Sequence, residues 1–275
     1  MTRRFPLLSI LVLALALVAL AIGFSGSASA AADHEGQDSG EPRVVAAHGV
    51  ARVGGEEALV EVLVVVPAGS DADEAARAAL REQGVRELGP RDLQSAAYSL
   101  TGLKWDQFGD LNPDNNFVTQ NYNPAREPSG AYAALTRSQD TWTGVTTSSF
   151  WLRNSGTTNR CPSLVRECPG PQFFDSKNDV GWLRLASNIL GVTWYGTSID
   201  EADIALNTQF KWYAGTGTPG RGQYDAETVF LHENGHVAGL GHSNVSGAVM
   251  EPYYAGVRRD LRPDDIAGIS ALYPS

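Results

Sequence analysis

Residues 232–242 have the types and the spacing of a catalytic metal centre. The segment reads His-Glu-Asn-Gly-His-Val-Ala-Gly-Leu-Gly-His, with His232 and His236 four positions apart. On a helix this spacing puts two side chains on one face about one turn apart, so both imidazoles can reach one metal ion. Gly239 lets the chain leave the helix, which would bring His242 round as a third ligand. Three protein ligands with one open position are typical of catalytic zinc.

Glu233 adds a carboxylate beside the first ligand, within reach of a water activated by the metal. As a general base it would take a proton from that water and then deliver it to the leaving amine of a cut peptide bond. This chemistry needs no Ser or Cys nucleophile. The shorter string His-Glu-x-x-His also occurs on ordinary polar helix faces. The full string, followed by Met250, favours the metal centre.

The extended string with its downstream Met resembles the metzincin signature, and finer details resemble the matrixins, the matrix-metalloproteinase type. Ser243 follows the third His, as is usual in matrixins. Residues 248–254 resemble their Met-turn and the wall of their specificity pocket, and residues 261–273 resemble their last helix. The close resemblance covers residues 226–275, and a looser one extends back to Tyr98.

The resemblance implies an α+β fold: a metzincin (zincin-like) domain whose twisted mixed sheet packs on an active-site helix and a C-terminal helix. It implies one catalytic Zn²⁺ held by neutral imidazoles of His232, His236 and His242, in a zinc-dependent endopeptidase.

Three further residues take roles from the same resemblance. Met250 would form an apolar floor under the imidazoles, which differs little from simple core packing. Pro252 and Tyr254 would form the wall of the pocket for the residue after the cut. Glu251 stands where matrixins often carry Tyr, so this wall is expected to differ.

Two features of the animal matrixins are missing. Their second, structural zinc needs a His/Asp-rich loop, but no His lies between His48 and His232, so we predict a single zinc. Their pro-segment blocks the zinc with a Cys thiolate, but residues 31–100 contain no Cys. Latency by that switch is therefore excluded.

Residues 1–30 read as a secretory signal, with Arg3 and Arg4 before an apolar stretch and a small-residue cleavage site. An uncleaved membrane anchor is the alternative. We expect residues 31–97 to form a pro-segment, with a small ancillary domain as the alternative, and residues 98–275 to form the catalytic domain. The protein would be a secreted zymogen.

The net charge of the chain limits the kinds of partner that it can bind. The net charge is −10, and removing residues 1–30 removes two arginines and no acids, which leaves −12. Such a surface disfavours nucleic acid and anionic lipid. We expect a protein or peptide substrate, no membrane binding after signal removal, and a monomer.

Cys161 and Cys168 are the only cysteines, and in an exported protein they predict a disulfide. Zinc-binding thiols are the alternative. The oxygen-rich loop around Asp110, Asn112, Asp114 and Asn115 could bind Ca²⁺, although a Pro/Asn turn is the commoner explanation.

The proposed pro-segment is predicted to be βαβ-like. A β-branched strand begins at Ala58 and ends at Pro67, a helix capped by Ser70 follows, and a short strand comes after Gly84. Residues 31–43 are expected to be disordered. His34 and His48 could cap the zinc, but we interpret them as solvated residues of a flexible leader.

Hydrophobic periodicity predicts the elements of the catalytic domain. We expect strands over 117–122, 148–152, 189–195 and 203–210, and helices over 129–142, 226–239 and 261–273. Core positions are expected at Ala133, Ala134, Leu135, Trp142, Val229, Phe230, Val237 and Leu240. Trp182, Trp194 and Trp212 are interpreted as packing residues.

Two other functions fit the same metal motif. A secreted zinc-containing protein could capture peptides without turnover, but binding alone does not need Glu233. A structural metalloprotein would use zinc only to hold the fold, but three ligands instead of four disfavour it.

Overall fold

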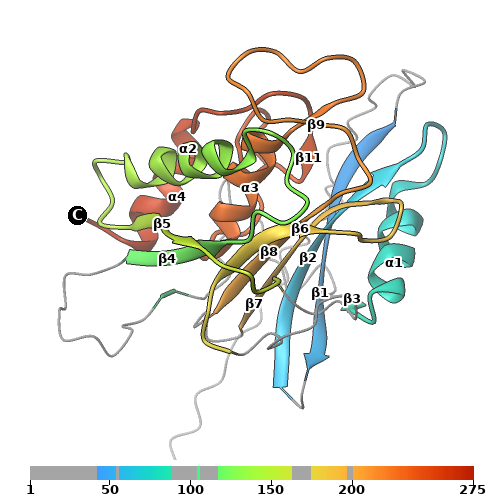
Figure 1. The fold of residues 1–275 in the computed structure, drawn as a ribbon, viewed down its shortest axis with the longest axis horizontal. Coiled ribbons are helices and arrows are strands. Elements are labelled where there is room, and N and C mark those ends of the chain that lie inside the picture. Colours follow the sequence, from blue (N-terminus) through green and yellow to red (C-terminus); the bar gives the residue numbers. More distant parts are fainter. Residues whose placement is uncertain (1–41, 54–55, 88–103, 106–116, 163–174, 197–200) are drawn as a thin grey trace, which may run out of the picture. The chain divides into compact units, whose positions relative to one another are not determined.

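The computed structural model describes residues 42–53, 56–87, 104–105, 117–162, 175–196 and 201–275 (Figure 1). Several predicted features lie outside these ranges: the signal at 1–30, His34, the oxygen-rich loop at 110–115, and Cys168. None of the helices within the described ranges is both long and apolar enough to cross a membrane.

Five strands form the part of the sheet that carries the looser resemblance. Their bounds are β4 Phe117–Tyr122, β5 Trp151–Thr157, β6 Asp179–Leu183, β7 Ile189–Gly196 and β8 Ala202–Asn207. They lie in the order β7-β8-β6-β4-β5, with β7 antiparallel to β8 and the other pairs parallel. This is the predicted mixed sheet. The sequence predicted β4, β5, β7 and β8, although β5 begins three residues later than expected. It did not predict β6.

A β-hairpin from the N-terminal region extends the same sheet. Its strands are β1 Arg43–Val53 and β2 Glu56–Val66. β2 pairs antiparallel with β7, and β1 pairs antiparallel with β11, which is Tyr253–Tyr254. The described sheet therefore runs β11-β1-β2-β7-β8-β6-β4-β5.

The N-terminal region differs from the predicted βαβ-like unit in its strand content. β1 was missed because its Ala and Gly residues have weak strand preference. The last strand, β3 Arg86–Glu87, pairs antiparallel with β1. The region is thus a hairpin followed by a helix and a short strand. Residue 43, which was expected to be disordered, opens β1.

Helix α1 Ala72–Glu82 follows the hairpin, and its N-cap lies one residue later than predicted. The side chain of Asp71 accepts a hydrogen bond from the backbone N–H of Glu74 at 2.9 Å, so Asp71 and not Ser70 is the N-cap. Gly84 ends the turn after the helix with a φ of +69°, a conformation that glycine adopts without strain.

The remaining helices are α2 Ala131–Thr143, α3 Ala226–Val237 and α4 Pro263–Leu272. Their buried residues share one core with one face of the sheet, while α1 shares a second core with the other face. Of the predicted core residues, only Ala133 is exposed. Trp182, Trp194 and Trp212, which were predicted to be packing residues, are buried. A short parallel pair, β9 Trp212–Tyr213 and β10 Tyr224–Asp225, leads into α3.

Candidate metal centre and active site

The N-terminus of helix α3 is fixed by the contacts of Asp225. Asp225 is the N-cap, and its carboxylate accepts from the backbone N–H of Thr228 at 2.9 Å. The same carboxylate pairs with Arg259 at 2.5 Å. Every residue of α3 is buried, so the helix has no freedom to turn a polar face to solvent. Because the whole helix is enclosed, its packing fixes which of its side chains point toward the sheet.

A buried amide network sets the rotation of α3 about its axis. Asn234 Oδ1 accepts from Gln120 Nε2 of β4 at 3.1 Å, and Asn234 Nδ2 donates to Ser138 Oγ of α2 at 2.9 Å. Gln120 also accepts from Gln139 Nε2 at 2.7 Å. Buried amides are costly unless they are satisfied, so this network favours one orientation of the helix and of the histidines beside Asn234.

Met250 packs directly against the helix at Gly235. A Cβ atom added at Gly235 would lie 2.2 Å from Met250 Sδ and 3.0 Å from the Trp142 ring. Only glycine leaves room for this approach. The buried carboxylate of Asp265 in α4 holds the Met-turn, because it accepts from the backbone N–H groups of Val249 at 2.9 Å and Met250 at 3.1 Å.

The three predicted ligands converge after the bend at Gly239, where φ is +95°. His232 Nδ1 lies 2.7 Å from the carbonyl oxygen of Val249, and His236 Nδ1 lies 2.8 Å from that of Leu240. Because a carbonyl only accepts, both Nδ1 atoms carry the proton. The Nε2 atoms of these two histidines face each other at 3.2 Å.

This donor set fits a zinc ion. When both imidazoles are neutral and carry their proton on Nδ1, the two Nε2 lone pairs cannot hydrogen-bond to each other, so a cation between them would satisfy both. Buried His242 Nε2 has no hydrogen-bond partner among the described residues. Orientation of imidazoles by backbone carbonyls is also the usual outer shell of a zinc site.

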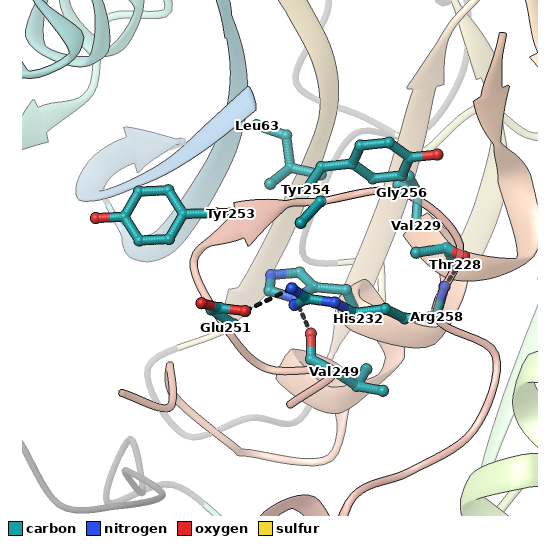
Figure 2. Close-up of a pocket in the computed structure, with 11 residues that line it drawn as sticks. Leu63, Thr228, Val229, His232, Val249, Glu251, Tyr253, Tyr254, Gly256 and Arg258 are labelled. Atoms are coloured by element: carbon teal, nitrogen blue, oxygen red, sulfur yellow. Dashed lines mark hydrogen bonds and ion pairs between the residues drawn. The ribbon is translucent and has the colours of Figure 1, made fainter. Parts of the chain in front are cut away.

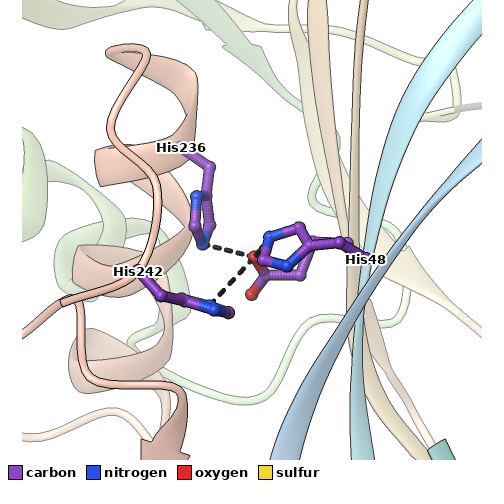
Figure 3. Close-up of side chains that lie close together, drawn as sticks. His48, His236 and His242 are labelled. Carbon is purple, nitrogen blue, oxygen red and sulfur yellow. Dashed lines mark ion pairs between the residues drawn. The ribbon is translucent and has the colours of Figure 1, made fainter. Parts of the chain in front are cut away.

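Two residues that were not predicted as ligands join the cluster. His48 of β1 and Glu61 of β2 are cross-strand partners on one face of the sheet. One ligand atom from each of His48, Glu61, His236 and His242 lies within 4.8 Å of the others. Figure 3 shows His48 reaching from β1 toward His236 and His242. His48 is buried, which corrects its interpretation as a solvated leader residue.

Glu61 makes the closest contacts in this cluster. Its Oε2 contacts His236 Nε2 and lies 3.3 Å from His242 Nε2, and its Oε1 lies 3.0 Å from His232 Nε2. The sequence carried a signal for it that was overlooked: Glu61 is the single charge in the apolar run from Ala58 to Val66. A lone acid at an inward position of a buried strand demands a partner.

The cluster shifts the ionisation of its members. Burial alone would raise the pKa of Glu61, but electrostatic interaction with the four surrounding imidazoles outweighs it and lowers the pKa well below its usual range. Burial lowers the pKa values of His236 and His242, so both are neutral and offer a lone pair. Burial also lowers the pKa of His232, but Glu61 outweighs it and raises the value to about 9. A metal at His232 Nε2 would displace that proton.

Glu233 is completely buried. Thr193 of β7 donates a hydrogen bond to its Oε2, whereas its Oε1 has no partner among the described residues. Burial, together with the charge of Glu61, raises the pKa of Glu233 to about 8. A carboxyl with one oxygen held and the other unpartnered suits proton transfer to and from a water.

A pocket opens beside His232 (Figure 2). Its lining includes Leu63, Val249, Tyr254 and Arg258. The hydroxyl of Tyr254 accepts from the backbone N–H of Asp225 at 2.9 Å. The lining does not include Pro252.

Residues around the pocket differ from the expected wall. The carbonyl oxygen of Pro252 instead accepts from the backbone N–H of Ala46 in β1 at 3.0 Å. Glu251, the departure noted in the sequence, also lines the pocket and pairs with Arg258 at 2.5 Å. Cys161 is not a free thiol, but Cys168 lies outside the described residues, so the Cys161–Cys168 pairing stays a prediction.

The C-terminal region is similar to known proteins. Residues 169–274 match the matrixin family model. The chain is 51% identical to karilysin of Tannerella forsythia over 49 residues, which are 18% of this chain and 10% of that protein. It is 55% identical to matrix metalloproteinase-19 of Homo sapiens over 47 residues, 16% of this chain and 9% of that one.

A longer and weaker match extends further toward the N-terminus. Matrix metalloproteinase-16 of Mus musculus is 25% identical over 201 residues, 66% of this chain and 29% of that protein. The matched region therefore spans less than a third of each of these relatives.

Proposed function

Because this chain carries a matrixin-type metzincin catalytic domain, we propose that it is a zinc-dependent endopeptidase that hydrolyses peptide bonds in proteins. The observation that carries the proposal is the convergence of the imidazoles. His232 and His236 turn their Nε2 atoms toward each other at 3.2 Å while their Nδ1 protons bind backbone carbonyls. Two Nε2 atoms that face each other in this way can both bind one cation.

His232, His236 and His242 would hold the metal ion. When bound, zinc supplies Lewis-acid activation of the attacking water and of the scissile carbonyl. Glu233 takes the proton of the water on one carboxylate oxygen, while Thr193 holds the other oxygen in place. Glu233 then delivers the proton to the leaving amine. Its complete burial keeps bulk water from competing for that proton.

Glu233 also favours an enzyme over a protein that only binds peptides. Peptide capture does not need a buried carboxylate with an unpartnered oxygen beside the metal ligands, and such a group is costly to bury. We further propose that the protein is exported, because residues 1–30 have the composition of a secretory signal. Its substrates would be unfolded or extended protein segments.

Cleavage of casein by the purified full chain tests this proposal. The chain would be assayed before and after limited proteolysis of its N-terminal region, with and without a zinc chelator. We expect the chelator to abolish cleavage, and Glu233→Gln to lower it by about 10²–10⁴-fold while zinc stays bound. Glu57→Gln, an exposed change on β2, is the matched control and should keep full activity. If the zinc-loaded chain cleaves no casein either before or after the limited proteolysis, the proposal that it is an endopeptidase is wrong.

A further inference from the structure

The β1–β2 hairpin occupies a position that a peptide substrate would use. β7 pairs with β8 on one side and with β2 on the other, in an antiparallel register from Ala58↔Gly196 to Val64↔Ile189. Without β2, that side of β7 would be a free strand edge. Extended peptides bind to such edges by adding a strand, so β2 and a substrate would compete for the same backbone groups.

The other strand of the hairpin closes the opposite side. β1 pairs with β11, with Val44 opposite Tyr254 and Val45 opposite Tyr253. Together the two strands take up the sheet positions between β7 and β11. β11 belongs to the wall of the pocket beside His232, because both of its tyrosines line that pocket. The hairpin is therefore bound on both sides by the elements that frame the active site.

The side chain of Leu63 in β2 contributes to the lining of this pocket. It lines the pocket with His232 and Val249 and is almost completely buried. Figure 2 shows it beside Tyr254. Glu61 lies two residues before Leu63, on the same face of β2 because strand side chains alternate. The strand thus places an apolar residue in the pocket and a carboxylate at the histidines.

The position of Glu61 is chemically specific. Both of its oxygens lie among the Nε2 atoms of the three proposed ligands, and its side chain is fully buried. A buried carboxylate without a positive partner would be strongly destabilising. Carboxylate oxygen is a common zinc ligand, so any ion held by these imidazoles lies within reach of Glu61.

His48 supports the carboxylate from the neighbouring strand. It stands directly opposite Glu61 in the β1–β2 register, and its Nε2 lies 2.6 Å from Glu61 Oε2. Its ring also packs against that of His242, with centroids 4.4 Å apart. We assign His48 a positioning role: it limits the rotamers of Glu61 and so keeps the carboxylate directed at the cluster.

We propose that Glu61 is the fourth ligand of the metal and that the β1–β2 hairpin thereby holds the enzyme in a latent state. This inference rests on the proposed function, since it concerns the same metal. Three histidines and one carboxylate would close the coordination shell and leave no position for the attacking water. Latency by carboxylate also accounts for a chain without a cysteine in residues 31–100.

Cobalt substitution tests this ligand without relying on activity. The full chain with the Glu233→Gln change would be loaded with Co²⁺, and its visible absorption recorded with and without the further change Glu61→Gln. We expect Glu61→Gln to alter the Co²⁺ bands, because water replaces a protein ligand. We also expect a chelator to remove the metal about tenfold faster or more. Glu57→Gln on the same strand is the matched control and should change neither.

A second measurement needs no change at Glu61. Acetohydroxamate added to the Co²⁺-loaded chain should leave the spectrum unaltered when Glu61 is present, and should shift it in Glu61→Gln. A bound metal whose spectrum and release rate are the same in both forms would overturn the ligand proposal and leave the peptidase intact. A hydroxamate response in the chain that retains Glu61 would overturn it as well. If the chain binds no Co²⁺ at all, the proposed function fails first.

Discussion

Gly235 shows how closely the site residues constrain one another. It lies between the proposed general base Glu233 and the proposed ligand His236, but its own importance is steric. The Met250 side chain and the Trp142 ring occupy the space that a Cβ would need. The motif spacing alone would allow any residue here, whereas the packing beneath the helix allows only glycine.

The change Gly235→Ala is therefore expected to destabilise the protein. A methyl group 2.2 Å from Met250 Sδ forces the Met-turn or the helix to move, and such overpacking costs about 1–3 kcal/mol. Thermal denaturation followed by circular dichroism measures the effect. Gly220→Ala is the control, because the atom nearest to its Cβ is the end of the flexible Gln223 side chain. Equal melting temperatures for both variants would contradict the steric role.

At the scale of elements, α3 and the hairpin position the site by different means. α3 is placed by its N-cap, its amide network and the Met-turn, all within the region of the close resemblance or in contact with it. The hairpin is placed by backbone pairing with β7 and β11. Strand pairing consists of many similar backbone hydrogen bonds. The side chain of Leu63 adds apolar contacts to this pairing where it lines the pocket.

We expect Leu63→Ala to loosen the hairpin. The truncation leaves a cavity beside His232 and Val249, and a buried Leu→Ala change costs about 2–5 kcal/mol. Hydrogen exchange should become faster in β1 and β2 and stay unchanged in β4 and β5. Leu59→Ala, a half-buried residue on the same face that does not line this pocket, should have a smaller effect. Unchanged exchange in β2 would show that the pocket does not anchor the hairpin.

At the scale of the described molecule, the hairpin shares both of its hydrophobic cores with the helices and strands that follow it. The core under α1 combines valines of β2 with Val192 and Trp194 of β7 and Ala205 of β8. The opposite core combines Val44 and Leu63 with residues of α2 and α3. Separation of the hairpin would therefore expose apolar surface on both faces of the sheet.

This shared interior predicts one cooperative unfolding transition for the intact, metal-loaded chain. The transition temperatures from far-ultraviolet and near-ultraviolet circular dichroism should coincide, because neither part keeps its core when the other unfolds. After the connection to the hairpin is cut and the hairpin is removed, the transition should shift to lower temperature. Two separate transitions in the intact chain would mean that the hairpin folds as an independent unit.

Local patterns predicted much of this arrangement. The helices around 129–142, 226–239 and 261–273 follow from periodicity and from the motif, and all three are present. β2 was evident from its run of β-branched residues. The cap of α1 was misplaced by one residue, because Ser70 and Asp71 both have side chains that can cap and only the backbone geometry chooses between them.

The sequence by itself predicted the three histidines and Glu233 as one site, because their spacing on a helix and around a glycine bend would bring them together whatever surrounds them. Only the tertiary structure decided that Glu61 reaches them, since it is 171 positions away from His232. That contact depends on the pairing of β2 with β7 and on the register that turns Glu61 and His48 to the same face. Long-range strand register arises from the whole sheet and leaves no local signature beyond one buried charge.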